Sequence, residues 1–185
     1  MKSIEFITEA RQGFLNYVKK VFPRMPDYVA YELIYKNSKN SPEDVRNIWV
    51  KYYGNLNWTL VNTFNVNSDV WDSETLYSIK GMMQQYDNED VKEYFPKNYA
   101  RFVKQKEHLQ QRGISQEPII VEESKDEPGK YALLEGWHRT VETMKVYPKG
   151  YTVPAYVGTP STKSEQIRQT KPDSFWTRIK KVFKK

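Results

Sequence analysis

The residues best suited to chemistry form one continuous run, Glu135-Gly136-Trp137-His138-Arg139-Thr140. The run lies where an expected strand leads into an expected helix. The first backbone N–H groups of a helix are unpaired and the helix dipole is positive there, so this position favours an anion. Gly136 lets the backbone approach a ligand closely, and the guanidinium of Arg139 can grip phosphate through two donors. The run therefore predicts a phosphate site, and we take the ligand to be a nucleotide.

The other members of the run add polar groups at the same place. Glu135, at the end of the strand, is positioned to orient a metal ion such as Mg²⁺ or to accept a proton. We take as candidate catalytic residues Glu135, His138 and Arg139. The candidate phosphate contacts are Gly136, Trp137, His138, Arg139 and Thr140. The alternative interpretation is a glycine-containing turn with a surface arginine and a partly buried histidine.

The composition excludes several classes of protein. The chain has 185 residues and no cysteine, which rules out a disulfide scaffold, thiol catalysis and cysteine-bound metal. With only two histidines, His108 and His138, a site built from several histidines is excluded as well. No apolar run approaches the roughly 20 residues that cross a bilayer, and the N-terminus is charged and amphipathic rather than apolar. We therefore expect a cytoplasmic protein.

Hydrophobic periodicity and turn residues predict an α+β fold. Apolar residues at helical spacing predict helices in the first part of the chain and at two later places, over residues 3–22, 27–36, 42–53, 73–83 and 97–112. Segments rich in β-branched and aromatic residues predict one strand or two over residues 57–66 and single strands over 118–121, 131–134 and 152–157. A short helix is expected from the candidate site to about Tyr147. We expect an N-terminal helical region (1–54) layered against a small mixed sheet (57–158), followed by a basic tail (159–185).

The net charge of +6 comes entirely from the tail. Residues 159–185 hold eight Lys or Arg and two acidic residues, so the rest of the chain is electrically balanced. The tail ends in a short amphipathic segment whose basic residues are candidate nucleic-acid contacts: Arg178, Lys180, Lys181, Lys184 and Lys185. Docking of its apolar face on the body of the protein is an equal alternative, and an anionic membrane is the least favoured.

Residues 114–157 resemble the core of the ParB/sulfiredoxin-like superfamily. The resemblance rests on the segments "GISQEPIIV", "KYALLEGWHRTVETMK" and "YTVPAYV". In that family a helix ending in glycine leads to a "PI-V" strand, a hairpin, a Gly-x-x-Arg or Gly-x-His-Arg motif and a closing strand. The resemblance implies a nucleotide-binding domain in which Gly136, His138 and Arg139 contact phosphates. It also implies that Thr140 is an auxiliary donor and that Glu135 lies beside the reacting phosphate or metal.

The chain departs from individual members of that superfamily. Sulfiredoxin chemistry needs a cysteine beside the histidine, and this chain has none. ParB has a more arginine-rich motif and a downstream helix-turn-helix domain, so DNA clamping of the partition type is not expected. A kinase of this type needs further acidic residues near the site, for which Asp69, Asp72 and Glu74 are candidates.

The first ten residues, MKSIEFITEA, are similar to the capsid-targeting leader of internal head proteins in T-even-type phages. The resemblance implies a phage protein whose leader is cut between Glu9 and Ala10, with packaging into the virion head. An amphipathic first helix packing on the body is the alternative.

Two functions follow from the sequence. The first is a ParB/sulfiredoxin-like protein that binds or hydrolyses a nucleoside triphosphate, ATP or CTP with Mg²⁺, as a kinase, NTPase or nuclease. The alternative is a non-enzymatic phage internal or DNA-binding protein with a cleaved leader and a tail that contacts DNA. The sequence does not give the oligomeric state.

Overall fold

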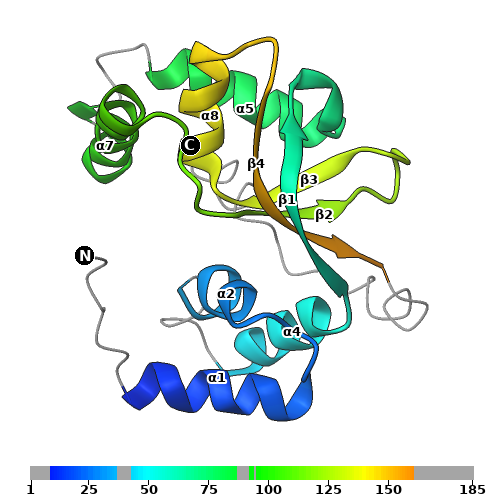
Figure 1. Cartoon of the computed structure of the whole chain (residues 1–185). Helices are drawn as coiled ribbons and strands as arrows, with labels where there is room; N and C mark the ends of the chain where they lie inside the picture. Colours follow the sequence, from blue (N-terminus) through cyan, green and yellow to red (C-terminus); the bar gives the residue numbers. More distant parts are fainter. Residues whose placement is uncertain (1–8, 37–42, 87–91, 94, 161–185) are drawn as a thin grey trace, which may run out of the picture. The chain divides into compact units, whose positions relative to one another are not determined.

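The computed structural model describes residues 9–36, 43–86, 92–93 and 95–160, which form an α+β fold (Figure 1). The chain divides into two compact units. One unit comprises Met1–Trp58 with Gly158–Lys185, and the other comprises Thr59–Val157. The candidate leader before Glu9 and the basic tail from residue 161 lie outside the described residues.

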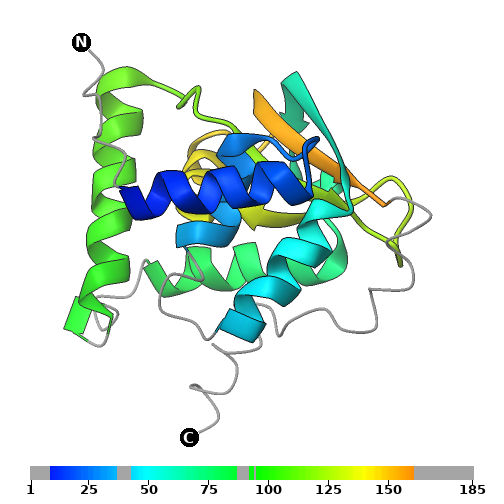
Figure 2. The ribbon, with the colours of Figure 1, turned by 90° about the horizontal axis from the view of Figure 1, so that it is seen from below.

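The first unit is built from helices. Its elements are α1 (Glu9–Val21), α2 (Asp27–Val29), the π-helical turn η1 (Ala30–Tyr35) and α4 (Glu43–Gly54). Both α1 and α4 pack against η1, and Figure 2 shows them in blue and cyan. The buried apolar residues of this unit include Val18 of α1, Ile34 of η1 and Val50 of α4. The three predicted helices are thus confirmed over the described residues, and the predicted start of the third at Pro42 lies outside them.

The second unit contains a four-stranded sheet in the order β1-β4-β2-β3. The strands are β1 (Asn57–Val66), β2 (Ile119–Glu123), β3 (Tyr131–Glu135) and β4 (Tyr151–Thr159). β2 and β3 run antiparallel, with Val121 opposite Leu133. Along β4 the buried residues Tyr151, Val153 and Ala155 alternate with more exposed ones, as in a strand with one face on the core. All four predicted strands are confirmed, with ends within two residues of the prediction.

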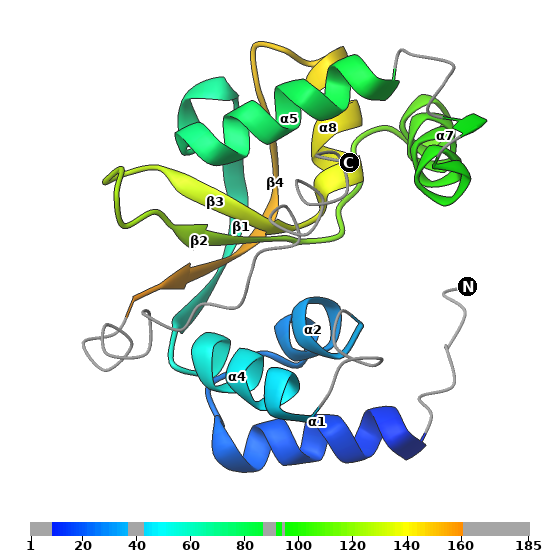
Figure 3. The ribbon, with the colours of Figure 1, turned by 180° about the vertical axis from the view of Figure 1, so that it is seen from behind.

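Three helices accompany the sheet: α5 (Ser73–Tyr86), α7 (Pro96–Arg112) and α8 (Trp137–Val146), with a short 3₁₀ turn η2 (Ser68–Val70) before α5. α8 packs against both α5 and α7, and Figure 3 shows α5 and α8 side by side next to the sheet. The buried side chains at these contacts include Ile79 of α5, Phe102 of α7 and Val141 of α8. α7 ends at Gly113, whose φ of 74° is accessible to glycine at little cost.

The segment before α5 protects the free edge of β3. Trp71 forms a parallel bridge with Tyr131, and the Asp72 N–H donates to the Tyr131 carbonyl at 3.0 Å. Further along, the Leu133 N–H donates to Thr75 Oγ1 at 3.2 Å. Exposed strand edges invite pairing with other chains, and these contacts satisfy the edge within the fold.

In the part of the chain that the structure describes, every helix is too short or too polar to cross a membrane.

Candidate phosphate site

Gly136 joins β3 to α8 in a conformation that requires glycine. Its φ is 101°, in the left-handed region, and it is the N-cap of α8. A Cβ at this position would lie 2.7 Å from Ile119 Cγ2, closer than real Cβ atoms approach a neighbour. The Gly136 carbonyl accepts the first helical bond, from the Thr140 N–H at 2.9 Å. Since glycine has no side chain, α8 lacks a side-chain cap at its positive end.

Arg139, in the first turn of α8, reaches back to the connection between α7 and β2. Its guanidinium forms an ion pair with the Glu117 carboxylate, and Nη2 donates to the Pro118 carbonyl at 3.0 Å. The Arg139 side chain is only 14% exposed, whereas that of Glu117 is 73% exposed. The guanidinium is therefore held in one place by packing, beside a carboxylate that remains in water.

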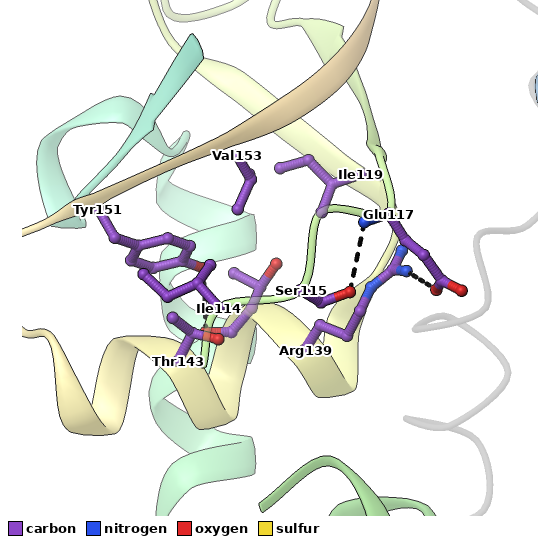
Figure 4. Close-up of a pocket in the computed structure, with 9 residues that line it drawn as sticks. Ile114, Ser115, Glu117, Ile119, Arg139, Thr143, Tyr151 and Val153 are labelled. Carbon is purple, nitrogen blue, oxygen red and sulfur yellow. Dashed lines mark hydrogen bonds and ion pairs between the residues drawn. The ribbon is translucent and has the colours of Figure 1, made fainter. Parts of the chain in front are cut away.

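Two small hollows flank Arg139. The first lies between α8, β4 and the α7–β2 connection, and a water-sized sphere has about 10 Å³ of space there. It is lined by Ile114, Ser115, Glu117, Ile119, Arg139, Thr140, Thr143, Tyr151 and Val153. Figure 4 shows Arg139 and Glu117 at one side of it, with Tyr151 and Val153 on the opposite wall. The second lies between α7 and α8, includes His108 and Glu142, and is of the same size. About 10–15 Å³ of such space holds one water, so neither hollow encloses a ligand.

The hydroxyl of Thr140, beside the first hollow, is fully buried and out of reach of a ligand at the surface. The neighbouring Tyr151 hydroxyl donates to the Thr140 carbonyl at 3.5 Å, and burial raises the pKa of Tyr151. A side-chain hydrogen bond between Thr140 and Tyr151 is among the smaller causes that lower the pKa of Tyr151. Tyr151 is therefore a neutral donor at physiological pH.

His138 faces a different neighbour. Its ring lies 4.9 Å from that of Phe102 on α7, centre to centre. Burial, with a smaller contribution from the positive charge of Arg101, lowers the pKa of His138 to about 4. Its Nε2 is buried without a hydrogen-bond partner among the described residues. The imidazole is therefore neutral at physiological pH and packs on α7, while Arg139 turns toward the α7–β2 connection.

The other two predicted residues bracket Gly136. Glu135 is the last residue of β3 and pairs with Ile120 across the sheet, so it lies at the strand end as the sequence indicated. Trp137 is a buried core residue, and its side chain belongs to the packing of α8. The structure thus places Gly136, Arg139 and Thr140 at one corner, with Glu135 on the strand that leads into it.

The acidic residues considered for a kinase lie elsewhere. Asp72 bonds to Tyr131, at the opposite end of β3 from Glu135. At about 3.3 Å per strand residue, the two ends of β3 are about 13 Å apart. The Asp72 carboxylate accepts from the Thr75 N–H at 2.8 Å and caps α5, which gives it a structural role. Asp69 and Glu74 flank the same α5 start, so the structure does not bring these three residues to the corner that holds Arg139.

The partners of Arg139, Glu117 and Pro118, were not predicted from the sequence. Both come from the connection that follows Gly113, where the Glu117 N–H also donates to Ser115 Oγ at 3.3 Å. A signal was present, because the quoted segment "GISQEPIIV" contains Ser115, Glu117 and Pro118. What the sequence lacked was a reason to bring that segment against the first turn of α8.

The described residues around Arg139 do not form a metal-ion site by themselves. Among the described residues, no group of three or more His, Cys, Asp or Glu is placed to hold a metal ion. Mg²⁺ that accompanies a nucleotide uses one or two carboxylates together with phosphate oxygens. The carboxylates near this corner are those of Glu117, which pairs with Arg139, and of Glu135, at the end of β3.

We compared the chain with protein-family profiles, with curated proteins and with solved structures, and none of the three comparisons found a match.

Proposed function

We propose that the second unit binds the phosphates of a nucleoside triphosphate at the first turn of α8. The observation that carries the proposal is the position of Arg139. Its side chain is 14% exposed and lies in the first turn of a helix whose N-cap has no side chain. Buried cations are rare unless they have a partner, and the one carboxylate that the structure shows on this cation is itself mostly in water.

The groups around Arg139 support a phosphate as the anion. The guanidinium fork and the Ser115 hydroxyl line the same hollow. A phosphate group has oxygens for several such donors at once, and Arg binds it through two parallel hydrogen bonds. The hollow has room for about one water, so the phosphates, sugar and base would all lie on the surface near the α7–β2 connection.

The chemistry that follows binding rests with Glu135. It is the carboxylate nearest in the chain to the phosphate corner, suited to orient Mg²⁺ or to accept a proton. His138, neutral and packed on Phe102, would contribute its backbone N–H rather than a positive charge. Within this proposal the resemblance to the ParB/sulfiredoxin-like superfamily supports ATP or CTP as the ligand, and the cytoplasm, where these nucleotides are found, as the location.

Isothermal calorimetry with ATP, CTP and GTP in the presence of Mg²⁺ tests the proposal. We expect the wild type to bind at least one of them and Arg139→Ala to bind it about 10- to 100-fold more weakly, since hydrogen bonds to charged groups contribute about 1.5–3 kcal/mol. Arg24→Ala is the matched control, because Arg24 is an exposed arginine of the other unit. Absence of binding to all three nucleotides, or equal binding by Arg139→Ala, refutes the proposal.

A turnover assay then separates binding from catalysis. Glu135→Gln preserves the shape of the side chain and removes its charge. If the bound nucleotide is hydrolysed, we expect this variant to bind it and to lose turnover. Retained turnover would exclude Glu135 as the base or metal-orienting group.

A further inference from the structure

The phosphate-binding arginine already holds an anion that belongs to the protein. Arg139 forms its ion pair with Glu117 across 22 residues of sequence, and Nη2 donates to the Pro118 carbonyl at 3.0 Å. Both partners come from the α7–β2 connection, which also lines the first hollow. In Figure 4 the Glu117 carboxylate lies directly beside the Arg139 guanidinium. A carboxylate oxygen and a phosphate oxygen make the same charge-assisted contact with arginine.

The two members of this ion pair differ in how far water reaches them. The Glu117 side chain is 73% exposed, so water solvates its carboxylate once the pair opens. Arg139 is 14% exposed and lies beneath the connection, so water reaches its guanidinium poorly. An exposed carboxylate contributes little to an ion pair, whereas a buried charge left alone is costly. An incoming anion therefore displaces Glu117 and leaves Arg139 where it is.

We propose that Glu117 is an intramolecular competitor that occupies the phosphate position on Arg139 until a ligand displaces it. This inference rests on the proposed function. Because the pair must open before any anion binds, Glu117 weakens all anions at this position by one common factor, the fraction of molecules in which Arg139 is available. Because the factor is common to all anions, Glu117 raises the concentration that each one needs and leaves the ratio of their affinities unchanged. A triphosphate, which makes further contacts, starts from a higher affinity and still binds.

Two substitutions at Glu117 test this inference without disturbing the core. Glu117→Gln removes the charge and keeps the shape, and Glu117→Ala removes the competing group altogether. The probes are the nucleoside triphosphate with Mg²⁺ and inorganic pyrophosphate, each measured by calorimetry. We expect both variants to bind both probes about three- to tenfold more tightly than the wild type, by nearly the same factor for the two probes. Glu107→Gln, which changes an exposed carboxylate of α7 that lines neither hollow, should leave both affinities unchanged.

The outcomes separate this inference from the proposed function. Equal nucleotide affinity in the wild type and both Glu117 variants refutes the competition and leaves nucleotide binding intact. Weaker binding by the variants also refutes it, and shows that Glu117 positions Arg139 for the ligand. A gain for the nucleotide alone shows that Glu117 repels another part of that ligand and is not a common competitor. If no protein binds either probe, both proposals fail.

Discussion

At the scale of single residues, neighbours in the sequence perform different tasks. His138 and Arg139 are consecutive, yet one packs on Phe102 of α7 and the other pairs with Glu117 before β2. Successive side chains of an α-helix point about 100° apart, so His138 and Arg139 face different neighbours. The candidate site depends on Gly136 and on Arg139, which lies three residues further along the chain.

Replacing Gly136 by alanine should destabilise the second unit. The alanine must keep a φ near 101°, and its Cβ would lie 2.7 Å from Ile119 Cγ2. We expect a loss of about 2–4 kcal/mol in the free energy of unfolding, combining the left-handed backbone with an overpacked contact. Chemical denaturation measures it.

Gly129→Ala is the control for that experiment. Gly129 also has a positive φ, 78°, but nothing lies within 4 Å of its would-be Cβ. It should lose only the backbone contribution, about 1 kcal/mol. Equal losses in the two variants would show that the contact with Ile119 is unimportant.

His138 should make stability depend on pH in the acidic range. Its pKa is about 4 in the folded chain and 6.5 in its ordinary state, so between these values the unfolded chain binds more protons. The free energy of unfolding should therefore fall as the pH drops from 6.5 to 4, by up to about 3 kcal/mol. Above pH 6.5 the residue contributes no pH dependence.

Urea denaturation at a series of pH values measures this effect, with His138→Gln as the comparison. The variant cannot titrate, so its stability should vary less between pH 4 and 6.5. NMR titration of the wild-type imidazole gives an independent check. A midpoint near 6.5 for His138 would contradict the burial described here.

At the scale of elements, α5 completes the sheet that positions the site. β3 is an edge strand, and its Leu133 N–H has no acceptor on a neighbouring strand that the structure describes. It donates instead to Thr75 Oγ1, in the first turn of α5. Thr75 is itself fixed by Asp72, whose carboxylate accepts from the Thr75 N–H at 2.8 Å. Since β3 leads directly into Gly136, this contact helps to hold the strand end that carries the site.

Thr75→Val should weaken this edge specifically. The substitution preserves the shape and removes the acceptor, which leaves the buried Leu133 N–H unpaired at a cost of about 1–3 kcal/mol. Hydrogen exchange should accelerate at the Leu133 amide more than elsewhere in β3. Thr63→Val, on the exposed part of β1, is the matched control and should change stability by less than about 0.5 kcal/mol. Unchanged protection of Leu133 would refute the role of Thr75.

At the scale of the whole molecule, charge and candidate site are separated along the chain. The second unit contains Gly136, Arg139 and Thr140, whereas the excess positive charge lies in residues 159–185. A basic tail and a phosphate site are therefore independent predictions, and each can fail without the other.

Neutralising the tail should remove salt-dependent DNA binding. We expect the wild type to bind duplex DNA with a slope of log K against log salt of about −4 to −5, if the five candidate residues each contact a phosphate. Changing Arg178, Lys180, Lys181, Lys184 and Lys185 to Gln should abolish this binding and leave nucleotide affinity unchanged. Fluorescence anisotropy across a salt series measures both the affinity and the slope.

A variant with the same change of charge elsewhere is the control. Five exposed lysines of the second unit suit this purpose: Lys80, Lys97, Lys104, Lys106 and Lys149. Their replacement by Gln should affect DNA binding much less. Equal loss in both variants would mean that DNA responds to total charge and not to the tail.

The sequence by itself determined what local chemistry can determine. Helix and strand positions followed from periodicity, and Gly136 was identified as the residue that turns β3 into α8. These features act within a few residues of one another, through backbone sterics and the alternation of apolar side chains. The absence of cysteine and the charge of the tail follow from the composition, whatever the fold.

Only the tertiary structure decided which groups meet. The pairing of Arg139 with Glu117 joins residues 22 apart, and it exists because α8 packs beside the α7–β2 connection. The low pKa of His138 likewise depends on burial beside Phe102, 36 positions earlier in the sequence. Contacts of this kind arise from the packing of whole elements, so the same local sequence in another fold would leave Arg139 in water and His138 with an ordinary pKa.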